Sequence, residues 1–206
     1  MDEQSLFRWI FIAIFVITFS LSGYFRRQAR RSGEVIRRAR EGRGMVVLRL
    51  LFAAPFYVSI LAYMINPAWM AWSMMSVPAW LRGLAALVGL GMLPIIYRVM
   101  RSIGQNISET LLTKAHHLLV THGPYRWVRH PLYSVATVVF VSLSIVAANW
   151  FMLTMALLLI VVISRVVIPR EEAQLILKFG DDYRAYQQRT GRLVPRLYRR
   201  RAVAHK

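Results

Sequence analysis

Four of the five histidines in this 206-residue chain fall within residues 116–130. At the end of this stretch, Arg129 and His130 come directly before Pro131. Proline suits the first position of a helix, and the free N–H groups of a helix N-terminus form a ready site for a carboxylate or phosphate. The segment therefore predicts an anion site with an arginine and a histidine beside it.

Two adjacent acids, Glu171 and Glu172, stand out because the whole chain has only nine Asp and Glu. We expect a membrane helix to end at Pro169 and an amphipathic helix to begin there. In its first turn, the acids would offset the helix dipole by about 0.3–1 kcal/mol. If they are instead buried, they need a cation. Arg129, Arg165 or a ligand's ammonium or sulfonium could supply it, and we expect Arg165 to point inward toward the acids.

Both segments also have a purely structural interpretation. Arg126 and Arg129 could be anchors that snorkel to the membrane surface, within an aromatic belt of tyrosine and tryptophan. The histidines could be solvated loop residues or zinc ligands. Zinc is disfavoured because no carboxylate or thiolate completes a set with His116, His117 and His122. We expect no metal ion.

Hydrophobic helices must hold these segments in place. The chain is 57% hydrophobic and only 17% charged, against about 25% charged in an average soluble domain. A membrane span needs roughly 17–25 apolar residues, and the charge-free stretch 132–164 is interrupted at 147–150, which favours a hairpin of two helices. The fold class is therefore an all-α polytopic membrane bundle with a C-terminal cytoplasmic amphipathic helix. Its five expected transmembrane helices lie near 6–25, 46–65, 79–99, 131–147 and 150–168.

The basic residues predict how the bundle is oriented. The chain has 27 Lys and Arg, eight of them arginines within 26–43, whereas 66–79 has none. By the positive-inside rule, the loop 26–44, the acid pair and the C-terminus are cytoplasmic, and the N-terminus is outside. We expect an integral protein of a bacterial inner membrane. The positive charge there serves anionic lipid headgroups rather than nucleic acid.

Four groups of residues occur in one order and spacing: Asn106 with Ser108; His117-x-Leu119-Val120-x-x-Gly123-Pro124-Tyr125-x-x-x-Arg129-His130-Pro131-x-Tyr133; Glu171-Glu172-x-x-Leu175-x-x-x-Phe179-Gly180-x-x-Tyr183-x-x-Tyr186; and Gly191-x-x-x-Pro195. This pattern resembles the isoprenylcysteine carboxyl methyltransferase family, whose wider superfamily includes membrane phospholipid N-methyltransferases. The resemblance covers 100–198 by motif and the preceding helices by layout only. One departure is Val135, where related sequences often have glycine.

The resemblance implies that S-adenosylmethionine binds on the cytoplasmic side. Its carboxylate suits His130 and its ammonium suits the acid pair, while aromatic faces can hold the adenine or the sulfonium. The implied catalytic residues are Arg129, which orients a carboxylate acceptor, and Asn106 as a further polar contact. For an amine acceptor, His117 is the candidate base. The residues implied to bind the cofactor are His117, Leu119, Val120, Gly123, Tyr125, His130, Pro131, Tyr133, Glu171 and Glu172.

The implied acceptor is a lipophilic or prenylated molecule embedded in the membrane. The expected organisation is three transmembrane helices in 1–99, a cofactor-binding region in 100–198 and a basic tail in 199–206. Two alternatives remain open at this point. One is a non-catalytic membrane protein that keeps the fold, and the other is an NADPH-dependent membrane reductase of the sterol type.

Overall fold

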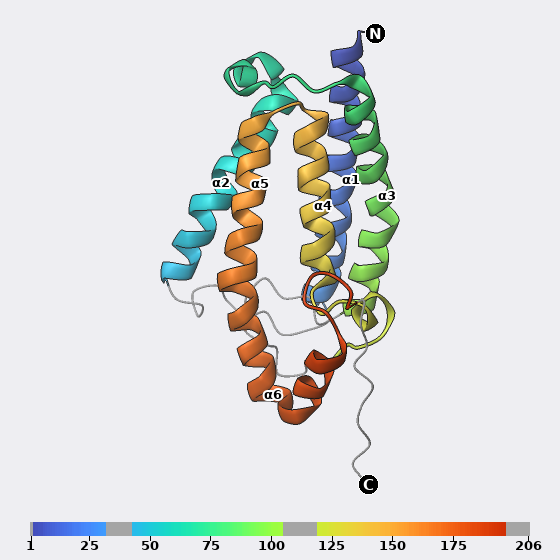
Figure 1. Cartoon of the computed structure of the whole chain (residues 1–206), viewed down its shortest axis with the longest axis vertical. Helices are drawn as coiled ribbons and strands as arrows, with labels where there is room; N and C mark the ends of the chain where they lie inside the picture. Colours follow the sequence, from blue (N-terminus) through green and yellow to red (C-terminus); the bar gives the residue numbers. More distant parts are fainter. Residues whose placement is uncertain (1, 32–42, 105–118, 197–206) are drawn as a thin grey trace.

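The computed structural model describes residues 2–31, 43–104 and 119–196, and in these ranges it is a helical bundle without named strands. Five apolar helices run along the long axis of the molecule (Figure 1). They are α1 (Glu3–Arg31), α2 (Arg43–Ile65), α3 (Ala79–Ile103), α4 (Pro131–Val146) and α5 (Trp150–Val162). The all-α helical bundle predicted from the charge-free stretches is confirmed.

Three helices are long and apolar enough to cross a membrane: Glu3–Arg31, Ala79–Ile103 and the continuous helix Trp150–Arg189. Two shorter apolar helices, Leu50–Ile65 and Pro131–Val146, complete the bundle. With 16 residues, α4 is about 24 Å long at 1.5 Å per residue. This is shorter than the ~30 Å hydrocarbon core of a bilayer.

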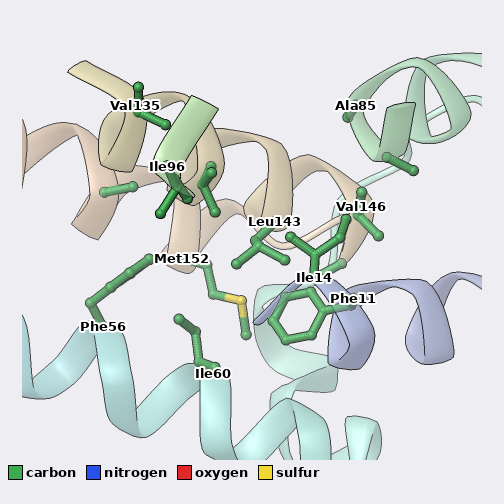
Figure 2. Close-up of a cluster of buried hydrophobic side chains, with 14 of the residues drawn as sticks. Phe11, Ile14, Phe56, Ile60, Ala85, Ile96, Val135, Leu143, Val146 and Met152 are labelled. Carbon is green, nitrogen blue, oxygen red and sulfur yellow. The ribbon is translucent and has the colours of Figure 1, made fainter. Parts of the chain in front are cut away.

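The core lies along the centre of the bundle, and each helix contributes to it. Figure 2 shows Phe11, Phe56, Ile96, Leu143 and Met152, one from each of the helices α1 to α5, meeting in one cluster of buried side chains. The helices can approach closely here because α3 has a glycine, Gly89, at the contact. A Cβ atom at this glycine would lie 3.1 Å from the Ile14 side chain of α1 and 3.5 Å from Ser142 of α4.

The two ends of the bundle differ in character. The arginine-rich end of α1, the end of α3, the segment 119–130 and α6 (Ile168–Arg189) lie at one end (Figure 1). At the other end lie the N-terminus, the short 3-10 helix η2 (Pro67–Ser73) and the turn between α4 and α5. The basic connections therefore gather at a single end of the described bundle.

The expectation that Pro169 ends the fifth helix is wrong. The chain passes from α5 into α6 through a π-helical turn, η5 (Ile163–Val167), and the helix continues across the proline. The Ile168 N–H group donates to Ile163 O, five residues back. A proline inside an α-helix clashes with the carbonyl four residues earlier. We attribute its tolerance here to the wider π turn directly before it, which changes that geometry.

The amphipathic helix predicted after the last membrane helix is confirmed as α6, which turns back on itself at Gly180. This glycine has φ 54° and ψ −125° inside the helix, a backbone conformation that residues with a Cβ rarely adopt. Figure 1 shows the final part of α6 and the chain after it returning toward the end of the bundle. The reversal brings residues 183–193 back to the start of α4.

Candidate functional site

The site is built where α4 begins. Pro131 occupies the first turn of α4, as predicted, and His130 immediately precedes it with a non-helical backbone. Because proline has no N–H group and fixes φ near the helical value, it starts the helix without losing a hydrogen bond. The His130 ring is buried and stacks against Tyr133, with ring centroids 5.9 Å apart.

Glu172 of α6 is the hub of the site. Its Oε1 accepts a hydrogen bond from Arg129 Nε at 2.8 Å and lies 3.2 Å from His130 Nε2. Its Oε2 accepts from Gln187 Nε2 and Arg192 Nη2, both at 3.2 Å. Both carboxylate oxygens are therefore committed to partners within the protein.

The environment of Glu172 favours the ionised carboxylate. The helix that begins at Trp150 runs unbroken to the bend at Gly180 and spans about 45 Å, which exceeds the ~30 Å bilayer core, so α6 extends beyond the membrane. Burial by itself raises the pKa of Glu172, but the hydrogen bonds from His130 and Arg129 and their charges outweigh it. They lower the pKa of Glu172 to about 2.

The segment after α6 docks beside the segment before α4 in parallel. Arg129 N donates to Gly191 O at 2.8 Å and His130 N donates to Arg192 O at 3.1 Å. The Arg129 guanidinium also donates through Nη1 to the carbonyls of Gln187 and Thr190. Backbone and side-chain bonds thus join two segments about 60 residues apart in sequence.

Glu171 differs from its neighbour in exposure. Its side chain is 32% exposed, whereas that of Glu172 is 6% exposed. Its Oε2 lies 3.8 Å from His130 Nδ1, so the histidine ring stands between the two acids. The two acids therefore differ: Glu172 is buried among the protein's own cations, whereas Glu171 is half-buried with its Oε2 beside His130.

The 3-10 helix η4 (Gly123–Arg126) holds two further predicted residues. Tyr125 is buried, and its carbonyl accepts a hydrogen bond of 2.6 Å from the Tyr186 hydroxyl. Burial, then the charge of Glu171 and contact with Tyr186, raise the pKa of Tyr125. Gly123 has φ 59°, and a Cβ there would lie 2.8 Å from Ser102 Oγ. Both residues thus have a clear packing role in addition to any contact with a ligand.

The structure therefore gathers Arg129, His130, Tyr133, Glu171 and Glu172 in one place, with Tyr125 tied to α6. Leu119 and Val120 are half-buried in the segment leading to η4, and Val120 packs against the main core. Asn106 and His117 lie outside the described residues.

The expectation that Arg165 points toward the acid pair is wrong, and three residues around Arg129 and Glu172 were not predicted. Arg165 lies in the π turn with its side chain exposed, whereas Glu172 contacts Arg129, His130, Gln187 and Arg192. Gln187, Thr190 and Arg192 were not predicted as site residues. The available signal was the scarcity of acids, because a buried carboxylate in so basic a chain draws several cations.

Comparison with known proteins relates part of the chain to one methyltransferase family. The model of the isoprenylcysteine carboxyl methyltransferase (ICMT) family matches residues 85–177. The chain is similar to this family over that region. The ICMT-family region contains most of α3, all of α4 and α5, and the acid pair at the start of α6. Gln187 and Arg192, which complete the shell around Glu172, follow the matched range.

A solved structure adds to this assignment. It is described as the eukaryotic intramembrane Ras methyltransferase ICMT (isoprenylcysteine carboxyl methyltransferase) without a monobody, and it is 25% identical with a TM-score of 0.52. The match covers 72% of this chain and 52% of that one, so this chain spans about half the length of its structural relative. No curated protein matches the sequence. The apolar helices and this likeness identify an integral membrane protein.

Proposed function

We propose that the chain is an S-adenosylmethionine-dependent methyltransferase that acts on a lipophilic acceptor in the membrane. The observation that carries this proposal is the ICMT-family region itself, whose two motif segments meet through Arg129 and Glu172. The chemistry of the meeting point supports it, because a half-buried carboxylate, a histidine and a stacked tyrosine surround the start of α4.

Of the two acids, Glu171 suits the ammonium group of the cofactor better than Glu172 does. Glu172 already neutralises two arginines, whereas the Glu171 carboxylate is partly exposed and can pair with an ammonium group. The start of α4 is a helix N-terminus, which suits a carboxylate. The buried hydroxyl of Tyr183 makes no hydrogen bond with any described residue and could serve a bound polar group.

The cofactor supplies an electrophilic methyl group, and the protein has to align the acceptor and exclude water. We propose that Arg129 is a positioning residue, because its guanidinium is held by Glu172 and two carbonyls. Orientation of a carboxylate acceptor then has to come from other groups, of which Asn106 remains a candidate. A carboxylate acceptor needs no base, whereas an amine acceptor would need one, with His117 as the candidate.

We propose a prenylated or other lipidic acceptor, anionic lipid headgroups as neighbours of the basic end, and a cytoplasmic site in a bacterial inner membrane. The arginines at the end of α1 and in 119–130, at the same end of the bundle as α6, support this orientation. No nucleic acid is expected, since the positive charge lies beside the ends of membrane helices.

Calorimetric titration of the purified full chain with S-adenosylhomocysteine and, separately, with NADPH tests the proposal. We expect the first to bind and the second not to bind. Binding of NADPH alone would indicate a reductase, and binding of neither would indicate a non-catalytic membrane protein. Incubation of lipid extracts with methyl-labelled cofactor then identifies the acceptor, because only a methyl ester releases labelled methanol in base.

The variant Glu171→Gln tests the site directly. Loss of one partner of a desolvated charge pair costs about 2–5 kcal/mol, or about 30-fold or more in affinity. The matched control is Asp181→Asn, the same chemical change at a fully exposed carboxylate on the same helix. Equal affinity of both variants for S-adenosylhomocysteine would show that Glu171 does not contact the cofactor.

A further inference from the structure

Five of the six tryptophans belong to the end of the bundle opposite the candidate site. Trp69 and Trp72 lie in η2, Trp80 begins α3, Trp150 begins α5 and Trp9 lies near the start of α1. Trp69 and Trp72 are 58% and 60% exposed, and no charged residue occurs between Leu50 and Leu81. η2 thus presents a large exposed aromatic surface within a stretch of chain that has no charge.

The turn between α4 and α5 explains why η2 lies here. Val146, Ala147, Ala148 and Asn149 are all buried, and Ala148 has the unusual positive φ of 48°. Because α4 is only about 24 Å long, this turn reaches no further than the edge of the hydrocarbon core. At that depth every backbone polar group needs a partner within the protein.

η2 and the chain after it supply those partners. Met75 N donates to Ala148 O at 2.8 Å, and the buried Asn149 Nδ2 donates to the buried Ser73 Oγ at 2.7 Å. Asn149 Oδ1 accepts from Met152 N at 2.9 Å and so caps α5. Trp72 packs edge-on against Trp150, with ring centroids 5.6 Å apart. The inner face of η2 is therefore fixed to the turn, which sets the direction of its outer face.

We propose that η2 is an interfacial anchor, whose outer face, Trp69 and Trp72, lies in the boundary between headgroups and acyl chains of the leaflet opposite the candidate site. Tryptophan prefers this boundary because its ring is apolar and its N–H group finds polar partners there. η2 lies between the shorter apolar helix Leu50–Ile65 and the helix Ala79–Ile103, which is long and apolar enough to cross a membrane, so lipid is the surface we expect to meet it. The inference does not depend on methyltransferase activity.

Tryptophan fluorescence of the full chain tests this placement. In the first variant Trp9, Trp80, Trp127 and Trp150 are replaced by Phe, which leaves the two tryptophans of η2. In dioleoylphosphatidylcholine vesicles we expect lipids brominated near the headgroup to quench its emission at least about two-fold more than aqueous iodide does. Strong iodide quenching without lipid quenching would overturn the proposal, because η2 would then lie in water.

Two comparisons keep the result interpretable. If the quadruple variant does not fold, the emission of the double variant Trp69→Phe/Trp72→Phe is subtracted from that of the parent. The difference is the signal of the same two residues. The second comparison is dilution of the protein in lipid. If protection from iodide disappears on dilution, a second copy of the chain covers η2, and the proposal is wrong.

The contact between Asn149 and Ser73 allows one further test of the placement of η2. Asn149→Ala removes both the bond to Ser73 and the cap on α5, and we expect about a two-fold rise in iodide quenching of the η2 tryptophans as the turn and the outer face lose their fixed direction. Thr154→Ala, at an exposed position of the same helix, is the matched control and should leave quenching unchanged. An equal response of both variants would contradict the role of the turn in orienting η2.

Discussion

Arg129 Nε and Glu172 Oε1 lie 2.8 Å apart, although the two residues are separated by 43 positions in the chain. Both side chains are at least nine-tenths buried. Desolvation of such a pair costs free energy that its attraction recovers only with good geometry and further hydrogen bonds. Here His130, Gln187 and Arg192 provide those bonds to the carboxylate. The pair fixes how α6 returns to the start of α4.

Glu172→Gln should destabilise the folded protein strongly. The amide leaves the buried Arg129 without its counter-charge, and removal of one partner from a buried pair typically costs about 3–5 kcal/mol. Thermal unfolding in detergent, followed by circular dichroism, measures the loss. Asp181→Asn is the control, because its exposed ion pair with Arg184 should contribute less than about 1 kcal/mol. Similar midpoints for the two variants would contradict the role of Glu172 as a hub.

The stability of the parent protein should fall with acid in a window that Glu172 defines. The pKa of Glu172 is about 2 in the folded protein, below its ordinary value of 4.5. A lowered pKa in the folded state stabilises the protein fully above pH 4.5, and this contribution disappears as the pH falls toward 2. We expect thermal midpoints of the parent to drop across this window and those of Glu172→Gln to drop less. Parallel curves would assign the acid sensitivity to other carboxylates.

The same substitution should have opposite effects at two glycines. Gly180→Ala places a Cβ on a residue with φ 54°, which costs about 1–3 kcal/mol of backbone strain and opens the return of α6. Gly83→Ala lies inside the regular helix α3, also without a neighbour within 4 Å, and should leave stability unchanged or raise it. Because neither added Cβ would meet a neighbour, a difference in the thermal midpoints of the two variants reports backbone strain and not steric overlap. Equal stability would mean that Gly180 tolerates a side chain.

Single cysteines should label from opposite sides of the membrane. The chain has no cysteine, and both Ser76 and Asp181 are exposed at opposite ends of the bundle. A membrane-impermeant maleimide should react with Ser76→Cys on intact spheroplasts and with Asp181→Cys only after lysis. The reverse pattern would invert the proposed orientation, and labelling of both from one side would contradict a bundle that spans the membrane.

Much of the helical framework is predictable from local sequence. The charge-free stretch that breaks at 147–150 predicts the α4–α5 hairpin, and Asn149 indeed caps α5. The proline rule fails at Pro169, because a π turn depends on how α5 packs rather than on the residues beside the proline. Val167 of this turn packs with Leu48 and Tyr133, which are far away in sequence.

The candidate site is predictable in its members but not in its pairing. Arg129 was one of three cations expected to serve the acids, and the sequence alone does not separate it from Arg165. The choice depends on the return of the chain at Gly180, which brings Gln187 and Arg192 onto the same carboxylate. Such partners come from three-dimensional proximity, and no motif spacing encodes them.

Because α5 passes into α6 without a break, the acid pair moves together with the membrane helix. A helix whose apolar length exceeds the local bilayer thickness responds by tilting. Because the helix continues through Pro169, a tilt of α5 is carried to Glu171 and Glu172, while α4 holds His130 against them. A change in the thickness of the surrounding lipid would therefore strain the contact between the start of α4 and the start of α6.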